Sequence, residues 1–390
     1  MKSVSVIGIG ETKIGRFADV SAKDMIKEAG EKAIADAGIQ KSDIEALFFG
    51  NFNGQQLSGQ GHMGPLAAEA LGLNNIPAIR VEGACASGSL AFRQALISVA
   101  SGVYDIVLVG GVEKMTHRGT ADVTEAIASA SDVEAEAEVG ATFPGIFALI
   151  ANRYKEEYVD PRDAMTYVAI QNHANASLNP DAQMPKPVTK EKVESSMMIA
   201  DPLTLFDCSL VSDGSAFVVV CSTDTAKKIN NGKKIIEVIG SGHAGQPLSI
   251  AAKDSITEFA ATKKAAADAY KQAGITPSDV DIAEVHDCFT ITQIINCEDL
   301  GFFEKGKAPE AILNGETSIK TGVVAVNSSG GLKAKGHPIG ATGISQIYEV
   351  ITQLRGDAGE RQVANAKIGL SHNIGGSAAT CVVNIFREAK

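Results

Sequence analysis

One cysteine in this chain lies where a nucleophile could form. A strand-like run, residues 76–81, ends just before Cys85, and a helix-like run, residues 89–100, begins just after it. A thiol at the start of a helix meets unpaired backbone N–H groups and the positive end of the helix dipole, which favour thiolate over thiol. The small residues at 83–88 leave room for an acyl group. A buried structural cysteine is the alternative, and only partners elsewhere can decide between the two.

Three further segments carry groups that could act with Cys85. They are His286-Asp287-Cys288-Phe289, the loop 336–343 with His337, and residues 372–376 with His372. Neither Cys-x-x-Cys nor His-x-x-x-His spacing occurs, so no metal site is expected. A serine hydrolase is disfavoured, because cysteine occupies the middle of the stretch Gly83 to Ser87. A cysteine nucleophile with a histidine base remains.

Length and composition indicate an ordinary globular protein. The 390 residues exceed the usual size of one domain, and 45% of them are hydrophobic without a run long enough to cross a membrane. The net charge of −11, without a cluster of Lys and Arg, argues against nucleic-acid binding. The N-terminus enters a strand at once and leaves no room for an export signal. We therefore expect a cytoplasmic protein with its six cysteines reduced.

The chain contains two related halves. Residues 37–45 recur as residues 273–281, and Val-Ile-Gly at 6–8 recurs at 238–240. The Gly-Ser-Ala triplet at 214–216 likewise recurs at 376–378. The second-half counterpart of the Cys85 corner falls in the loop 336–343, and the counterpart of residues 106–111 falls at 368–373. The repetition predicts that Cys85 and His337 face each other.

The pattern of elements predicts an α/β fold. Strands are expected at 4–9, 47–49 and 216–221, and an amphipathic helix is expected from the N-cap Ser21 to Ala37, with Gly38 just past its end. Alternating strands and helices imply parallel sheets covered on both faces, with ligands beyond the carboxyl ends of the strands. Gly8-Ile9-Gly10 does not make a dinucleotide site, because Lys13 replaces the third glycine.

The first half is interrupted by an insertion, since its last strand appears only after about residue 202. The insertion contains an acidic tract, residues 132–138, expected to face solvent, and a polar helix, residues 161–176. We expect this lobe to hold substrate. The predicted organisation is a first half at 1–115, the insertion at 116–201, completion of the first half at 202–230 and the second half at 231–390.

These motifs resemble those of the thiolase family over essentially the full length. The stretches that carry the resemblance are 83–88, 110–115, 212–216, 327–331 and 336–343. The resemblance implies two like halves in five αβαβα layers with an inserted loop domain. It also implies coenzyme A thioesters as substrates, with no further cofactor and no metal.

The chain departs from the commonest thiolases in two places. Asn373-Ile374-Gly375 stands where those enzymes have Cys-x-Gly, and His286-Asp287-Cys288-Phe289 stands where they have Asn-Glu-Ala-Phe. Both changes resemble the sterol-carrier-protein type of thiolase, and more narrowly its stand-alone archaeal members, acetyl-CoA acetyltransferases. In that type the cysteine of the His-Asp-Cys-Phe loop has the second acid–base role. The resemblance therefore assigns this role to Cys288 and not to Cys381.

The same resemblance assigns the other roles. His337 takes the proton of Cys85, which attacks an acyl-CoA to give an acyl-enzyme. His286 and His337 hold the enolate oxygen of acetyl-CoA, and the backbone N–H groups of Cys85 and Gly375 hold the tetrahedral intermediate. Ser209 matches a serine that contacts the pantetheine arm. The predicted reaction joins two acetyl-CoA into acetoacetyl-CoA and CoA.

Other functions and partners remain open from the sequence. The alternatives are a degradative 3-ketoacyl-CoA thiolase, a ketoacyl synthase-like condensing enzyme and an inactive acyl-CoA-binding scaffold. Family members are homo-oligomers, and the weakly charged run 51–73 is a candidate for the interface. The archaeal resemblance suggests the first step of the mevalonate route, with 3-hydroxy-3-methylglutaryl-CoA synthase and a small OB-fold bridging protein as partners.

Overall fold

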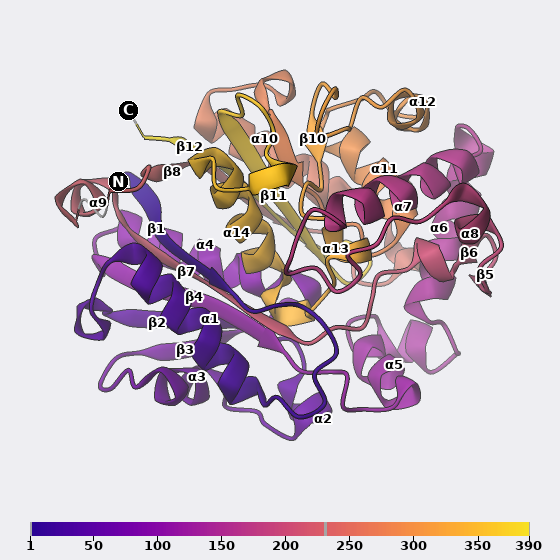
Figure 1. Cartoon of the computed structure of the whole chain (residues 1–390). Coiled ribbons are helices and arrows are strands. Elements are labelled where there is room, and N and C mark those ends of the chain that lie inside the picture. The colour runs from indigo at the N-terminus through magenta and orange to yellow at the C-terminus, as the bar shows by residue number, and fades with distance from the viewer. Residues whose placement is uncertain (1, 230–231, 390) are drawn as a thin grey trace.

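The computed structural model describes residues 2–229 and 232–389 (Figure 1), so the predicted boundary between 230 and 231 lies outside the described residues. The strands of the main sheet are β1 (Val4–Glu11), β2 (Ala46–Gly50), β3 (Ala78–Val81), β4 (Ile106–Glu113), β7 (Gly214–Ser222), β8 (Ile236–Gly245), β9 (Ile282–Glu284), β10 (Ala325–Val326), β11 (Ile368–Gly375) and β12 (Thr380–Glu388). They form a ten-stranded sheet in the order β10-β9-β11-β12-β8-β1-β7-β4-β2-β3. A separate hairpin pairs β5 (Met198–Ala200) with β6 (Leu203–Thr204).

The strand order is a mirror image about the pair β1 and β8. Outward from that pair, each half repeats the same five positions, so β1, β7, β4, β2 and β3 correspond to β8, β12, β11, β9 and β10. The pairing directions match as well. The predicted duplication is therefore confirmed. The expected parallel sheets were wrong, because β7 and β12 run antiparallel to both of their neighbours and only the outer strands of each half pair in parallel.

The helices are α1 (Ala22–Ala37), α2 (Gly54–Ser58), α3 (Met63–Leu71), α4 (Ser87–Ala100), α5 (Thr120–Ala128), α6 (Phe143–Glu157), α7 (Arg162–Ala176), α8 (Lys190–Glu194), α9 (Thr223–Ile229), α10 (Ala260–Ala273), α11 (Thr290–Asp299), α12 (Ala308–Leu313), α13 (Gly331–Ala334) and α14 (Thr342–Arg355). Helix α1 packs on β1 and β7, and its counterpart α10 packs on β8 and β12. Helices α4 and α14 contact each other between the two halves (Figure 1). Each half of the sheet forms one layer, with α4 and α14 between the two halves and α1 and α10 on the outside. The result is the expected layered order of helix, strand, helix, strand and helix.

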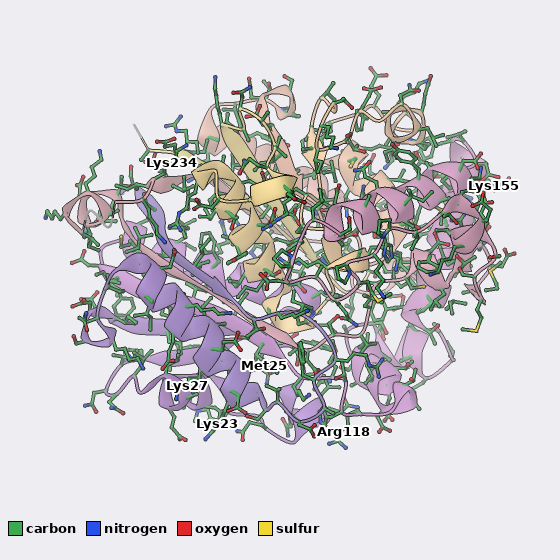
Figure 2. All side chains as sticks on the ribbon, viewed as in Figure 1. Lys23, Met25, Lys27, Arg118, Lys155 and Lys234 are labelled. Atoms are coloured by element: carbon green, nitrogen blue, oxygen red, sulfur yellow. The ribbon has the colours of Figure 1, made fainter. Side chains whose placement is uncertain are left out.

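Helix α1 shows how local sequence sets an element. The Ser21 hydroxyl accepts a hydrogen bond from the Asp24 N–H, the Asp24 carboxylate accepts one from the Ser21 N–H, and Gly38 ends the helix at φ 70°. Met25 is buried, whereas Lys23 and Lys27 are exposed and point outward in Figure 2. Both predicted ends of this helix are confirmed.

Equivalent glycines allow each outer helix to approach its sheet. A Cβ atom added at Gly10 of β1 would collide with the Ala29 carbonyl oxygen of α1. One added at the corresponding Gly242 of β8 would collide with the Ala265 carbonyl oxygen of α10. The sequence repeat thus preserves a backbone-to-backbone contact between helix and strand, where no side chain fits.

The insertion between β4 and β7 contains α5 to α8 and the β5–β6 hairpin, at the right of Figure 1. Its acidic tract does not lie wholly in solvent as expected. The Glu136 side chain is buried and accepts a hydrogen bond from the Ile250 N–H of the second half, 2.7 Å away. The predicted polar helix forms as α7, and its polar residues Gln171, Asn172 and Asn175 are buried and bond to the second half. These side chains therefore hold the lobe to the core.

The weakly charged run 51–73 is not an extended loop. It forms α2 and α3, and its apolar side chains Leu57, Met63 and Leu71 are buried within the same chain. Packing inside the subunit therefore explains its low polarity. In the described residues, no helix combines the length and the apolar character that a membrane crossing requires.

The glycine contact predicts an effect on stability. Gly242→Ala should lower the free energy of unfolding by about 1–3 kcal/mol, because the added methyl group must displace the backbone of α10. The matched control is Gly245→Ala in the same strand, where an added Cβ would lie an ordinary 3.4 Å from the nearest atom. Urea unfolding of both variants measures the difference. Equal midpoints for the two variants would contradict the packing described here.

Candidate active site

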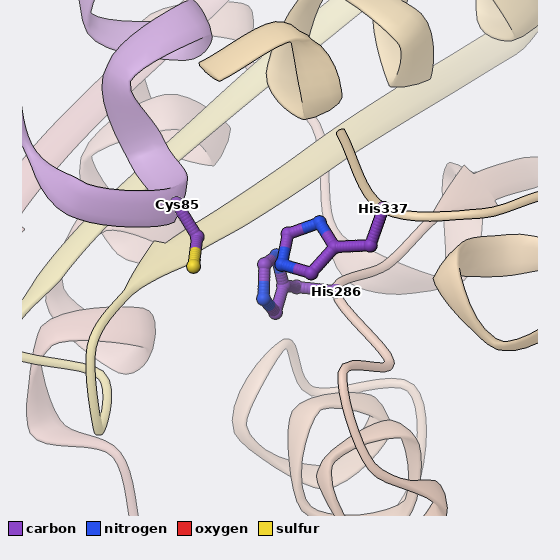
Figure 3. Close-up of side chains that lie close together, drawn as sticks. All are labelled: Cys85, His286 and His337. Carbon is purple, nitrogen blue, oxygen red and sulfur yellow. The ribbon is translucent and has the colours of Figure 1, made fainter. Parts of the chain in front are cut away.

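Cys85 lies in a tight turn between β3 and α4. The turn Ala84–Ala86 is a single 3₁₀ turn, and Ala84 adopts φ 51°, a left-handed conformation that is rare for a residue with a side chain. The Ser87 hydroxyl accepts a hydrogen bond from the Gly83 N–H at 3.0 Å and donates one to the Ala84 carbonyl at 2.6 Å. These bonds close the turn and hold the half-buried Cys85 side chain toward the two histidines in Figure 3.

His337 comes from the corresponding turn of the second half, just before the 3₁₀ turn Ile339–Ala341. Its backbone N–H donates to the Ser212 hydroxyl at 2.9 Å. Its ring atom Nδ1 lies 2.7 Å from the Thr342 Oγ1, and the Thr342 hydroxyl donates to the Pro338 carbonyl at 3.0 Å. Because that hydroxyl proton is already used, Nδ1 must be the donor to Thr342. The other ring nitrogen, Nε2, then keeps a free lone pair and can accept a proton.

His286 follows strand β9 and packs edge-on to His337, with ring centroids 5.2 Å apart and an interplanar angle of 87°. The Asn296 side-chain amide donates to the His286 carbonyl at 2.8 Å. The Asn373 Nδ2 atom on β11 lies 3.0 Å from the His286 Nδ1. With Asn373 as donor, His286 carries its proton on Nε2 and can donate it to a substrate oxygen.

The Cys85 Sγ and one ring nitrogen of each histidine all lie within 4.8 Å of one another. The structure thus brings together three side chains that are far apart in the sequence. Cys288 is buried nearby, with its Sγ 3.7 Å from the Thr292 Oγ1. Its carbonyl accepts a hydrogen bond from the Ser209 N–H at 2.8 Å.

A cavity of about 200 Å³ opens onto Cys85, His337 and Cys288, whereas His286 is buried and does not line it. Cys85, Cys288, His337 and Ser209 all line it. Much of the remaining wall is apolar and comes from the inserted lobe, including Val123, Ile127, Phe143, Pro144 and Phe147. An apolar cavity with a few convergent polar groups is the usual form of a small-molecule site, and the expected substrate-holding role of the lobe fits this placement.

Burial sets the resting protonation of the site. It raises the pKa of the Cys85 thiol to about 12, even though the backbone N–H of Gly376 bonds the sulfur and lowers it; the charge of buried Glu113 raises it further. Burial likewise lowers the pKa of His337 to about 3. Both groups are therefore neutral at pH 7. The helix start favours the thiolate, but the loss of solvent around the sulfur has the larger effect on the pKa of Cys85.

The second pair of groups is also neutral. Burial, together with the nearby Cys85, raises the pKa of Cys288 well above its ordinary value. Burial, with His337 and His372 nearby, lowers the pKa of His286 well below its ordinary value. In the resting site both cysteines are therefore protonated thiols and both histidines are neutral. A proton must leave the Cys85 sulfur as it attacks a substrate.

Gly375, predicted to supply an oxyanion-hole N–H, is the last residue of β11. Its backbone packs so closely on the Gly83 carbonyl that a Cβ would collide with it. The next residue, Gly376, lines the cavity. The end of β11 thus lies directly beside the Cys85 turn, where backbone N–H groups can meet a developing negative charge.

His372, with no assigned role from the sequence, lies behind the site. Its Nδ1 accepts a hydrogen bond from the His286 backbone N–H at 3.3 Å, and its Nε2 lies 3.1 Å from the Thr262 Oγ1. It is fully buried and does not line the cavity. It supports the backbone of His286.

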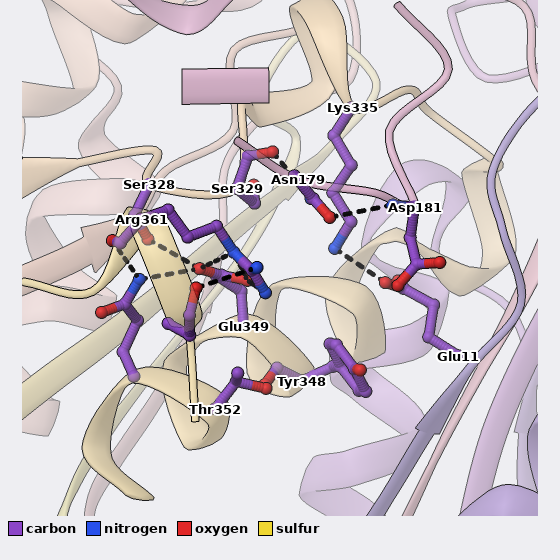
Figure 4. A network of polar contacts seen from close by, with 12 residues as sticks. Glu11, Asn179, Asp181, Ser328, Ser329, Lys335, Tyr348, Glu349, Thr352 and Arg361 are labelled. Carbon is purple, nitrogen blue, oxygen red and sulfur yellow. Dashed lines mark hydrogen bonds and ion pairs between the residues drawn. The ribbon is translucent and has the colours of Figure 1, made fainter. Parts of the chain in front are cut away.

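Buried ion pairs anchor the loop that carries His337 (Figure 4). The Lys335 Nζ lies 3.1 Å from the Glu11 Oε2 on β1, which ties the loop to the first half. The Arg361 guanidinium binds both oxygens of Glu349, and the Ser328 hydroxyl donates to the same carboxylate at 3.0 Å. The first pair ties the start of the loop to β1, and the second joins α14, which follows the loop, to Ser328 and Arg361.

Sequence reasoning missed three supporting residues. Thr342 orients His337, and Asn373 orients His286. Glu113 accepts hydrogen bonds from the Phe52 and Gly340 N–H groups, joining the two halves below the site. In the sequence, Asn373 stands out only as the replacement for a cysteine, and Thr342 and Glu113 only as parts of family motifs.

Comparison with known proteins identifies the family. Residues 4–224 match the thiolase N-terminal domain, and residues 242–388 match the thiolase C-terminal domain-like family. The chain belongs to the thiolase family. The resemblance and the fold expected from it are confirmed.

Similar thiolase relatives cover the whole chain. An acetyl-CoA acetyltransferase of Methanothermobacter thermautotrophicus is 49% identical over 386 residues, covering 99% of this chain and 100% of the relative. One of Methanocaldococcus jannaschii is 46% identical over 394 residues, covering 100% of both. The sterol carrier protein 2 of Gallus gallus is 34% identical over 98% of this chain and 71% of its own length.

Solved structures share the fold. The structure of an Ltp2-ChsH2(DUF35) aldolase has a TM-score of 0.85 at 25% identity, covering 98% of this chain and 97% of its own. The acetyl-CoA acetyltransferase from Syntrophomonas wolfei has a TM-score of 0.76 at 20% identity and covers 100% of both chains. The thiolase fold therefore extends over the full chain.

The neutral Cys85 thiol predicts a pH dependence. Alkylation of Cys85 by iodoacetamide should accelerate about tenfold per pH unit from about pH 7 to about pH 9, because a raised pKa makes the thiolate scarce until the pH approaches it. Peptide mass mapping separates Cys85 from the other pocket cysteines. A rate that is already flat near pH 7 would show a resting thiolate and contradict the burial argument.

Proposed function

We propose that this protein is an acetyl-CoA C-acetyltransferase that condenses two acetyl-CoA reversibly into acetoacetyl-CoA and CoA. One observation carries the proposal: Cys85, His286 and His337 converge within 4.8 Å beside a cavity that Cys288 also lines. This arrangement supplies a nucleophile, a base, an oxygen donor and a second acid–base group. The two archaeal relatives that cover the full chain carry this activity in their names.

The first half-reaction forms an acetyl-enzyme. His337 Nε2 takes the proton of Cys85 as the sulfur attacks the carbonyl carbon of acetyl-CoA. Backbone N–H groups of Cys85 and Gly375 hold the tetrahedral oxyanion. The CoA sulfur leaves with the proton of Cys288. Acetyl-Cys85, a Cys288 thiolate and a protonated His337 remain.

The second half-reaction returns the site to neutrality. The Cys288 thiolate removes an α-proton from the second acetyl-CoA, while His286 and His337 donate to the enolate oxygen. The enolate carbon attacks acetyl-Cys85, and the released Cys85 sulfur takes its proton from His337. Every group is then neutral again, as the raised thiol pKa values and the lowered imidazole pKa values require of the free enzyme.

Thiolysis of acetoacetyl-CoA by free CoA tests the function directly. We expect CoA-dependent loss of acetoacetyl-CoA with two acetyl-CoA formed per turnover. A scaffold protein would show no turnover, and a ketoacyl synthase would require carrier-bound substrates. A degradative thiolase would prefer longer 3-ketoacyl chains, so the rates with acetoacetyl-CoA and a long-chain substrate must be compared. No CoA-dependent turnover would refute the proposal.

A Cys288→Ala variant separates the two half-reactions. Condensation should fall by about 10²–10⁴-fold, because nothing removes the α-proton. Acetylation of Cys85 should still occur, because CoA can leave as a thiolate when Cys288 is not there to protonate it. Intact-mass measurement after mixing with acetyl-CoA detects the acetylated protein. Cys297→Ala, in the fully buried core of α11, is the control for loss of a nearby thiol. Equal loss of acetylation and condensation in Cys288→Ala would show that Cys288 has another role.

We further propose that the active form is a homo-oligomer. Strand β3 is an end strand of the sheet, next to the Cys85 turn, and its Ile79 side chain is 52% exposed. Pairing of β3 with a second copy of the chain would cover both the free edge of the sheet and the Ile79 side chain. Light scattering should show a dimer or larger, and Ile79→Lys should yield monomers with reduced activity. A fully active wild-type monomer at micromolar concentration would contradict this proposal.

The direction of the reaction depends on partners. We propose a cytoplasmic enzyme at the first step of the mevalonate pathway, with acetoacetyl-CoA passed to 3-hydroxy-3-methylglutaryl-CoA synthase through a small OB-fold protein. The two archaeal relatives are named for the acetyl-CoA acetyltransferase activity that such a first step requires, and the structurally similar Ltp2-ChsH2(DUF35) aldolase is named for two components. The test is to purify the protein repeatedly from native lysate and look for the two partners. Recovery of the thiolase without either partner would contradict the proposed complex.

A further inference from the structure

We propose that Cys85, His286 and His337 together bind a thiophilic divalent metal ion of the Zn²⁺ class, which reversibly blocks the nucleophile. The binding rests on the geometry alone, whereas the inhibition rests on the proposed acyl transfer at Cys85. The ion is a competing ligand of the catalytic groups and not a cofactor of the reaction.

The distances suit such an ion. The Cys85 Sγ and one nitrogen of each histidine lie within 4.8 Å of one another, and the two rings stand at 87°. Tetrahedral Zn²⁺, with bonds of about 2.0–2.3 Å, holds its ligand atoms roughly 3.3–3.7 Å apart. Side-chain rotations that close the gap by about 1 Å complete a Cys-His-His site with a fourth position open.

The residues behind the histidines resemble the supporting shell of a metal site. Each histidine has its Nδ1 engaged, by Thr342 on His337 and by Asn373 on His286, which directs the other nitrogen toward Cys85. The Asn373 Oδ1 is buried and has no hydrogen-bond partner among the described residues. Turning that amide over lets Oδ1 accept the His286 Nδ1–H, and Nε2 then offers its lone pair to the ion.

The donor set determines which ion fits. One sulfur and two imidazole nitrogens favour Zn²⁺, Co²⁺ or Cd²⁺ over Mg²⁺ and Ca²⁺, which prefer oxygen ligands. The nearby Glu113 does not supply such oxygens, since its carboxylate accepts hydrogen bonds from Asn51, Phe52 and Gly340. On binding, Cys85–SH and M²⁺ give a Cys85–S–M⁺ bond and one released proton, while the histidines contribute lone pairs.

The open position faces the substrate cavity. Cys85 and His337 both line the cavity, whose wall also contains the Cys288 thiol. An ion at the cluster therefore occupies the point that the thioester carbonyl must reach. Acetylation of Cys85 removes the sulfur ligand, so metal and acetyl group exclude each other.

Cobalt binding tests the inference without turnover. Titration of the purified protein with Co²⁺ should give one ion per chain and a sulfur-to-cobalt charge-transfer band, displaced by Zn²⁺ and unaffected by Mg²⁺. Cys85→Ser should abolish the band. Cys208→Ser, which alters another cavity-lining thiol outside the cluster, should keep it. Thr342→Val should weaken binding about 10–100-fold while leaving the band in place at saturation.

The results that overturn the inference are distinct from those that overturn the proposed function. Absence of a stoichiometric Co²⁺ band, or a band that survives Cys85→Ser, refutes the metal site whatever the thiolysis activity. Prior treatment with acetyl-CoA should block cobalt binding, and Zn²⁺ should inhibit thiolysis competitively with the acyl donor. A protein that binds Co²⁺ at Cys85 but shows no thiolysis would keep the site and refute the acyltransferase.

Discussion

The two halves of this protein pack tightly around the Gly340 carbonyl oxygen, and the active site depends on that contact. The Gly340 carbonyl, three residues after His337, lies against the backbone of three first-half glycines. A Cβ added at Gly50 or Gly88 would lie 2.7 or 2.9 Å from this oxygen, and one at Gly111 would collide with it. Any side chain at these positions would push the halves apart. Because α4 begins just after Cys85, the same contact sets the distance between nucleophile and base.

Burial at this contact between the halves then sets the protonation states of Cys85 and His337. Closing the halves removes water from both the sulfur and the imidazole, which favours their neutral forms. A neutral pair is poorly reactive toward most electrophiles and becomes a nucleophile only when a thioester is placed so that proton transfer and attack occur together. The buried ion pair of Glu11 and Lys335 holds the start of the His337 loop against β1. The low resting reactivity and the catalytic competence thus have the same physical origin.

Much of the fold could be predicted because its signals are local. The serine and glycine that bound α1 and the repeated Val-Ile-Gly strand starts are short-range signals. The directions of β7 and its counterpart β12 are not local, since they depend on which strands each one pairs with in the folded sheet, and parallel sheets were wrongly expected. The burial of Glu136 depends on a partner more than a hundred residues away, at Ile250.

The candidate site divides in the same way. Cys85, His337, His286 and Cys288 could be found because their residue types lie at turns and match family motifs. Thr342 and Asn373 could not, because each matters only through the ring atom that it contacts in the folded chain. The raised pKa of the Cys85 thiol could not be predicted for a related reason: the sequence shows that a helix starts there but not how far the folded chain removes the sulfur from solvent.

The central claim is that His337 activates a neutral Cys85 during attack. The rate at which acetyl-CoA acetylates the protein, followed by intact mass and located by peptide mapping, tests it most directly. We predict one acetyl group on Cys85 in the wild type and a rate about 10²–10⁴-fold lower in His337→Gln. An unchanged rate in His337→Gln, or acetylation on a different cysteine, would contradict the account.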